Sequence, residues 1–129
     1  MRRICVILLI SLILSSAVFA EDEATPVLSY YEVKPSLVAN LASGGKYIRT
    51  DIQLMTQDQG FKEVLELHGP AIRHTLLLLL SEQDGKTIKT PDGKETLRKQ
   101  ALESVRKLMQ ELTDLDSLQA LFFTTFFVQ

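Results

Sequence analysis

The side chains that could carry chemistry in this chain are few and widely spaced. The two histidines, His68 and His74, lie six residues apart, which places them on different faces of a helix. The single cysteine, Cys5, lies in an apolar N-terminal stretch and cannot join them as a metal ligand. We therefore predict no metal site, and we expect His74 to face solvent rather than to act in catalysis.

Carboxylates and one glycine-containing segment are the remaining candidates. Four acidic residues fall on predicted helices and turns: Glu63, Glu66, Asp114 and Asp116. Paired-acid catalysis needs two carboxylates in a cleft that excludes water, and their spacing does not imply one. Gly85-Lys86-Thr87 lacks the earlier glycine and the preceding buried strand of a nucleotide-binding loop. The sequence thus predicts no catalytic residue, no cofactor and no enzymatic activity.

The first twenty residues are typical of a secretory signal. Arg2 and Arg3 precede an apolar stretch that ends in small residues, and cleavage is predicted after Ala20. The alternative is an uncleaved N-terminal anchor, because residues 4–20 reach the lower end of the roughly 17–25 residues that span a bilayer. In both cases the positive-inside rule predicts that the rest of the chain lies in the periplasm, close to the inner membrane.

The charge balance argues against nucleic acid as a partner. The chain has 129 residues with 14 basic and 16 acidic side chains, and loss of residues 1–20 would leave 12 basic residues and a net charge of −4. Lys86, Lys89 and Lys94 are neighbours in sequence, but no aromatic residues are interleaved with them for stacking on bases. We predict a solvated loop at this point and no binding of nucleic acid.

Residues 21–26 are acidic and indicate a flexible lead, and residues 27–129 hold enough apolar side chains for one modest core. Val27–Val33 predicts a first strand that Pro35 ends, with Tyr30 and Tyr31 on opposite faces or on an arm that contacts a neighbour.

A β-hairpin is the firmest strand prediction. Segments 36–41 and 47–56 flank Ala42-Ser43-Gly44-Gly45, whose two glycines suit the positive backbone angles of a tight turn. Four residues of the second arm alternate with polar neighbours: Ile48, Thr50, Ile52 and Leu54. This period of two predicts a sheet with one face against a core and the other facing water or a partner.

Two helices at an angle are predicted between residues 58 and 80. Asp58 suits a helix cap, four residues follow at helical spacing, and Pro70 interrupts the helix after Gly69. The four are Phe61, Val64, Leu65 and His68. Leu76–Leu80 is too short to span a membrane and has charged neighbours, so we predict a buried core helix.

The last helix and the segment after it are equally clear. Thr90 suits the N-cap and Pro91 the first turn, and Glu95–Lys99 and Glu103–Lys107 have the spacing of ion pairs. The apolar stripe comprises Leu97, Ala101, Val105, Leu108 and Leu112. Residues 121–129 carry four phenylalanines, which predicts a closing strand shielded from solvent.

These elements together predict an α+β fold. We expect a single small domain whose mostly antiparallel sheet is covered on one face by two or three helices. Such an open sheet has unpaired edges, and edges associate unless they are guarded.

The segment Asp92–Arg98, the helix that follows and the final Phe-Phe-Thr-Thr-Phe-Phe-Val-Gln resemble the FliL family of flagellar basal-body-associated proteins. Asn40-Leu41, Tyr47-Ile48-Arg49 and Pro70-Ala71-Ile72-Arg73 extend the resemblance to about residues 30–129. Relatives commonly carry an N-terminal transmembrane helix, from which residues 1–20 depart. The resemblance implies a stomatin-type fold, assembly into arcs or rings, and a non-enzymatic accessory that associates with the flagellar stator and basal body and supports motility. A stomatin-like periplasmic scaffold with no role in motility is the alternative.

Overall fold

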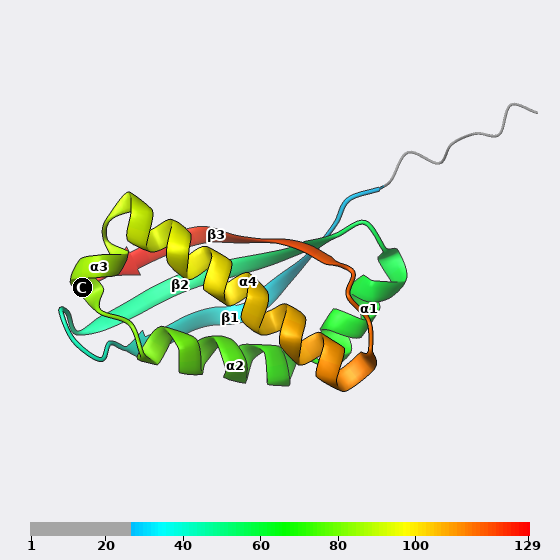
Figure 1. Ribbon diagram of the computed structural model, residues 1–129, viewed down its shortest axis with the longest axis horizontal. Coiled ribbons are helices and arrows are strands. Elements are labelled where there is room, and N and C mark those ends of the chain that lie inside the picture. Colours follow the sequence, from blue (N-terminus) through cyan, green and yellow to red (C-terminus); the bar gives the residue numbers. More distant parts are fainter. Residues whose placement is uncertain (1–26) are drawn as a thin grey trace, which may run out of the picture.

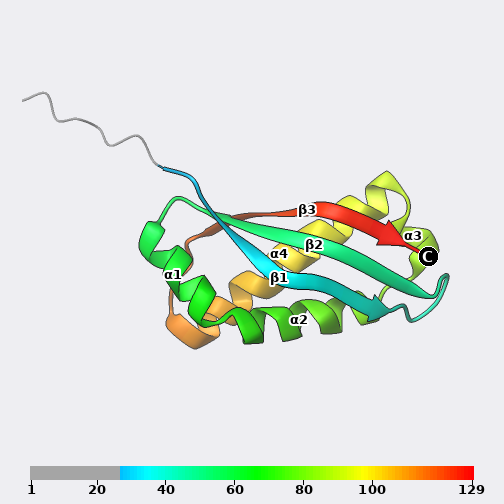
Figure 2. The same cartoon turned by 180° about the vertical axis from the view of Figure 1, so that it is seen from behind.

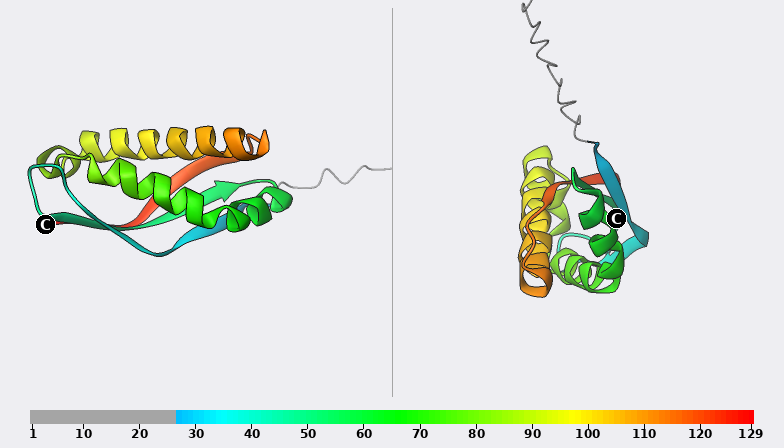
Figure 3. Two further views of the ribbon diagram at one scale, coloured as in Figure 1. Left: turned by 90° about the horizontal axis from the view of Figure 1, so that it is seen from below. Right: turned by 90° about the vertical axis from the view of Figure 1, so that its right-hand side faces the viewer.

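A computed structural model describes residues 27–129; the predictions for residues 1–20 and 21–26 lie outside this part of the chain. Its elements are β1 (Ser29–Asn40), β2 (Tyr47–Thr56), α1 (Gln59–Leu67), α2 (Gly69–Ser81), α3 (Gly85–Ile88), α4 (Pro91–Thr113) and β3 (Leu118–Val128) (Figure 1). The helices form one layer and the sheet the other (Figure 3). The predicted α+β fold is confirmed, with the one-turn helix α3 where a loop was expected.

The sheet has three strands in the order β1-β2-β3, and both pairs are antiparallel. The prediction that Pro35 ends the first strand is wrong, because β1 continues through a cis Lys34–Pro35 peptide bond and a bulge between Val33 and Leu37. Proline can remain in β1 because this is an edge strand, where a missing N–H breaks no ladder. Tyr30 is exposed and Tyr31 is half-buried, so they lie on opposite faces as expected.

The hairpin between β1 and β2 is confirmed, although only one of its glycines needs a special conformation. Gly44 has a positive φ of 68°, and Gly45 does not. A Cβ atom on Gly44 would lie 1.9 Å from a carboxylate oxygen of Asp84. The turn therefore requires glycine both for its backbone angle and for its close approach to α3.

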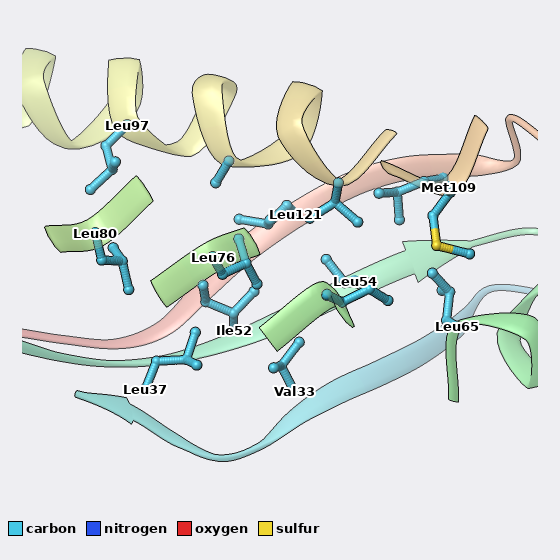
Figure 4. Packing of buried hydrophobic residues seen from close by; sticks show 14 of the residues in the cluster. Val33, Leu37, Ile52, Leu54, Leu65, Leu76, Leu80, Leu97, Met109 and Leu121 are labelled. Carbon is cyan, nitrogen blue, oxygen red and sulfur yellow. The ribbon is translucent and has the colours of Figure 1, made fainter. Parts of the chain in front are cut away.

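The core lies between the sheet and the helices, as Figure 4 shows. The predicted alternation in β2 is confirmed, because Ile48, Ile52 and Leu54 are completely buried beside Thr50. Thr50 is satisfied there by donating a hydrogen bond to the carbonyl of Thr125 at 2.6 Å. Each buried side-chain polar atom of the described residues has a partner.

The break between α1 and α2 is also confirmed. Asp58 caps α1 by accepting a hydrogen bond from the Phe61 amide at 3.3 Å, and His68 lies between the two helices. Leu76 and Leu80 are buried in α2, whereas Leu78 is 53% exposed. The leucine run is therefore one face of a core helix, and within residues 27–129 no helix has the length and apolar character needed to cross a bilayer.

α4 begins as predicted and buries the first three residues of the predicted stripe, Leu97, Ala101 and Val105, but not the last two. Thr90 accepts a hydrogen bond from the Gly93 amide at 3.0 Å, and Pro91 occupies the first turn. After Val105 the next buried residue is Met109; Leu108 is only half-buried and Leu112 is 47% exposed. Steps of four exceed the 3.6-residue turn, so the buried stripe winds around α4 as the helix crosses the sheet.

The ion pairs on α4 also differ from expectation. Glu95 pairs with Arg98 at 2.5 Å and Glu103 with Arg106 at 3.1 Å, in place of Lys99 and Lys107. Each arginine also donates to a backbone carbonyl of β3. A guanidinium has five donors in a planar fork, so each arginine can bind a carboxylate and a carbonyl at the same time.

Candidate interaction surface

The side chains considered for chemistry are distributed over α1, α2 and the segment after α4. His74 is exposed on α2, and His68 is half-buried at the junction of α1 and α2. All four candidate carboxylates are exposed: Glu63, Glu66, Asp114 and Asp116. Over residues 27–129 no three His, Cys, Asp or Glu side chains come together in a way that could hold a metal ion. The candidate sites are therefore surfaces that could contact another protein.

The segment Gly85-Lys86-Thr87 forms the first turn of α3. Asp84 caps this helix, because its carboxylate accepts from the Thr87 hydroxyl at 2.8 Å and from the Thr87 amide at 3.2 Å. Ser43 in the hairpin turn also donates to Asp84, at 3.2 Å. These hydrogen bonds, with that from the Thr87 hydroxyl first, lower the pKa of Asp84 below its ordinary value. The segment thus joins α3 to the hairpin.

Within residues 27–129, one face of the sheet carries no helix (Figure 2). Val38 of β1 lies opposite Arg49 of β2, which in turn lies opposite Phe127 of β3. Val38 is 55% exposed and Phe127 is 52% exposed. The Tyr47 and Phe127 rings are 6.2 Å apart on this face. The uncovered face is therefore mixed apolar and polar, as the surfaces of protein–protein contacts are.

The prediction that the four phenylalanines of the last strand are shielded from solvent is wrong. Phe122 is 40% exposed and lies on the uncovered face with Phe127, whereas Phe123 and Phe126 are half-buried on the helix side. A bulge causes this division: Thr125 pairs with Asp51 and Phe123 pairs with Ile52, so one residue between them has no partner. The extra residue reverses the alternation of side chains along the strand.

Asp51 holds this bulge in place. The Thr125 hydroxyl donates to the Asp51 carboxylate at 2.7 Å and accepts from the Asp51 amide at 3.0 Å, and Thr124 donates to the Asp51 carbonyl at 3.3 Å. Hydroxyl groups of Ser36 and Thr125, in that order, lower the pKa of Asp51. Side chains thus replace ladder hydrogen bonds at the bulge. Sequence reasoning missed it, and the only signal was the Thr-Thr pair between two Phe-Phe pairs.

The edge of the sheet at β1 is guarded. Glu32 and Lys34 form an exposed ion pair at 3.3 Å, and Pro35 and the bulge follow. Arg73 of α2 donates to the carbonyls of Pro35 and Ser36, the second at 3.2 Å. Charge, proline, a bulge and capped carbonyls are the features by which edge strands avoid pairing with other chains.

Within residues 27–129, arginines guard the edge at β3 over its first part only. Arg106 donates to the carbonyls of Leu118 at 2.9 Å and Gln119 at 3.3 Å, and Arg98 donates to that of Leu121 at 3.3 Å. Residues 117–129 contain no charged side chain. The second half of β3 is therefore an uncharged, aromatic edge strand.

A groove of about 300 Å³ runs between this strand and the first turns of α4. Pro91, Glu95 and Arg98 form one wall, and Phe122 and Phe123 form the other. Lys94, which also lines the groove, holds its ammonium 4.8 Å from the centre of the Phe126 ring. The aromatic side chains beside the edge thus have open space next to them.

Comparison with known proteins points to one family. The family model described as "Flagellar basal body-associated protein FliL" matches residues 30–129. A "Flagellar protein FliL" of Aquifex aeolicus (strain VF5) is 26% identical over 101 residues, which cover 77% of this chain and 60% of that relative. The matched region runs from β1 to the end of the sequence, so it includes both edges of the sheet and the uncovered face.

Proposed function

Because this chain belongs to the FliL family of flagellar basal body-associated proteins, we propose that it is a non-enzymatic accessory of the flagellar motor. The observation that carries this proposal is the extent of the match, residues 30–129, which spans nearly the whole described domain. The solvent exposure of His74 and of the four candidate carboxylates supports a role in binding rather than catalysis.

The proposed place of action is the periplasm beside the inner membrane. Residues 1–20 would deliver the chain there as a cleaved signal or hold it there as an anchor, and residues 21–26 would connect them to the domain. Stator units and the basal body are the proposed partners, and copies of the chain would assemble around them as an arc or ring.

Support of motility would come from differential binding. An accessory that binds the active, extended stator conformation about 1.4 kcal/mol more tightly than the inactive one shifts their ratio tenfold. The uncovered sheet face is the surface we propose for the stator contact. It lies on the side of the domain away from the helices and combines exposed Val38 and Phe127 with charged Arg49.

Deletion of the gene and complementation with matched surface variants test this proposal. Val38→Asp changes the uncovered face and Leu78→Asp changes the helix layer, and the two side chains are almost equally exposed. We expect the natural chain and Leu78→Asp to restore swimming in soft agar and the number of fluorescently tagged stator units at motors. Val38→Asp should restore neither, although the variant chain accumulates normally.

Normal swimming and normal stator numbers in the deletion strain would contradict a motor function. If that strain instead showed altered membrane-protein complexes in the envelope, the rival role as a stomatin-like scaffold would be favoured. Equal complementation by both variants would retain the motor function and reject the uncovered face as its contact surface.

A further inference from the structure

The residues of β3 read almost the same in both directions. Leu121-Phe122-Phe123-Thr124 is followed by Thr125-Phe126-Phe127-Val128. The order of residue types is therefore mirrored about a centre between Thr124 and Thr125, apart from Leu at one end and Val at the other. The family match does not explain this order by itself, because a strand buried against one core needs no such symmetry.

The folded strand has the same symmetry as its sequence. Residues 121, 123, 126 and 128 share the helix side of the sheet, since their partners are Leu54, Ile52, Thr50 and Ile48. Phe122 and Phe127 share the uncovered face, opposite Gln53 and Arg49. An unbroken strand would place residues 123 and 126 on opposite faces. The bulge at the centre restores the match between the two halves.

The backbone groups along the free edge follow the same pattern. Arg98 binds the Leu121 carbonyl, so the backbone N–H and C=O groups of Leu121 point away from β2. Those of Phe123, two positions further along the strand, point the same way. At the other end Gln129 exchanges both backbone hydrogen bonds with Tyr47, at 3.0 Å each. Alternation then turns the N–H and C=O groups of Val128 and Phe126 outward. The outward groups are thus also symmetric about the centre.

We propose that β3 pairs with β3 of a second copy, antiparallel, about a twofold axis between Thr124 and Thr125. In this register Phe123 lies opposite the partner's Phe126, and both point their backbone groups into the new ladder. Phe122 lies opposite the partner's Phe127 on the uncovered face. Each aromatic side chain at the edge gains an aromatic cross-strand neighbour, and the two sheets become one of six strands.

Several features favour a second copy as the occupant. The strand has no charged residue between 117 and 129, so self-pairing places no like charges opposite each other within the two strands. The groove lined by Phe122 and Phe123 leaves room along this edge for the partner's rings. The Leu121 carbonyl is already bound by Arg98, and Arg106 binds those of Leu118 and Gln119, so the new ladder is centred on Phe123 and Phe126 and ends at Leu121.

This contact closes on itself, because a twofold interface uses the same patch on both copies. It makes the dimer the unit of assembly, and an arc or ring would need a second contact elsewhere on the domain. The inference concerns the purified chain alone and stands whether or not the motor function is correct.

A charge exchange tests both the interface and its register. Phe122→Glu and Phe127→Lys change exposed side chains, so each single variant should keep the fold of one copy by circular dichroism. Each should raise the dimer Kd at least about thirtyfold in sedimentation experiments, as loss of a central aromatic contact does. In the double variant F122E/F127K each Glu lies opposite the partner's Lys, and the Kd should return to within about tenfold of the natural chain at low salt. Leu78→Lys, on the helix layer, should leave the Kd unchanged.

A second measurement does not depend on charge. Chains with Phe122→Cys, mixed with chains with Phe127→Cys in a Cys5→Ser background and exposed to an added oxidant, should form the mixed disulfide in preference to either symmetric one. A natural chain that stays monomeric would overturn the proposal. So would a double variant that dimerises no better than the single variants, or a loss of dimer in Leu78→Lys equal to that in Phe127→Lys.

Discussion

The two edges of this small sheet are built in opposite ways. At β1, an ion pair, a proline, a bulge and Arg73 together leave little for another strand to bind. At β3, Arg98 and Arg106 cover only the first carbonyls, and the rest of the strand is uncharged and aromatic. The same device, an arginine from a covering helix, guards both edges. Within residues 27–129 no arginine binds the carbonyls of β3 beyond Leu121, and this is the part of the strand that we propose pairs with a second copy.

The largest effect is expected from two neighbouring residues of β3, one of which should affect the stability of the fold and the other the association of two copies. Leu121 is completely buried and Phe122 beside it is not. Leu121→Ala should therefore lower the free energy of unfolding by about 2–5 kcal/mol, as other large-to-small core changes do. Phe122→Ala should lower it by less than about 1 kcal/mol in the monomer and act mainly on the dimer Kd. Urea unfolding at low protein concentration measures the free energy of unfolding of both variants. An equal loss in the two would contradict the placement of Leu121 in the core and of Phe122 on the uncovered face.

The next effect compares the guards of the two edges. Arg73→Ala leaves the Pro35 and Ser36 carbonyls without their donor, and Arg106→Ala does the same for Leu118 and Gln119. Each change should cost about 1.5–3 kcal/mol in urea unfolding, the range for hydrogen bonds to charged groups. Lysine at either position should recover only part of this lost free energy of unfolding, because it lacks the planar fork of donors. Full stability in both alanine variants would show that these hydrogen bonds do not hold the edges.

A smaller effect concerns the helix that carries the β3 guard. Thr90 caps α4 next to the groove, and Thr90→Ala removes the acceptor of the Gly93 amide. The expected loss of unfolding free energy is about 1 kcal/mol, with Thr90→Ser as a control that keeps the cap. A loss in Thr90→Ser equal to that in Thr90→Ala would assign the effect to packing of the methyl group instead.

The smallest effect is the dependence of stability on pH. Hydrogen bonds lower the pKa of Asp84 at the β1–β2 turn and of Asp51 at the β3 bulge. A lowered pKa in the folded state stabilises it above the ordinary value of 3.8, and this contribution is lost as the pH falls through the lowered value. Asp84→Asn and Asp51→Asn should each flatten the fall of the urea midpoint in acid. If the urea midpoint of both variants fell with pH as steeply as that of the natural chain, the stabilising role of these two carboxylates would be contradicted.

Most elements of the fold were predictable because their signals are local. The caps Asp58 and Thr90, the break at Gly69-Pro70 and the alternation from Ile48 to Leu54 each depend on residues within a few positions. The errors have non-local causes. β1 passes through Pro35 because it is an edge strand. α4 buries Met109 in place of Leu108 and Leu112, because its buried residues continue at steps of four where the helix packs on the rest of the domain.

The candidate surface was the least predictable part. Four phenylalanines in the last strand indicated burial, since nothing near them in sequence shows that Thr124 and Thr125 form a bulge against Asp51. Likewise, the partners of Arg73, Arg98 and Arg106 belong to other elements of the chain. Their spacing in sequence could show helix faces but not which strand edge each helix would cover.

The sequence by itself determined the element types, the α+β class and the family, because hydrophobic period, capping residues and motif order are properties of short stretches. Only the tertiary structure decided which side of β3 each phenylalanine takes and which edge of the sheet stays open. These features depend on register and on side chains reaching across from distant elements, where one extra residue in a strand reverses every face beyond it.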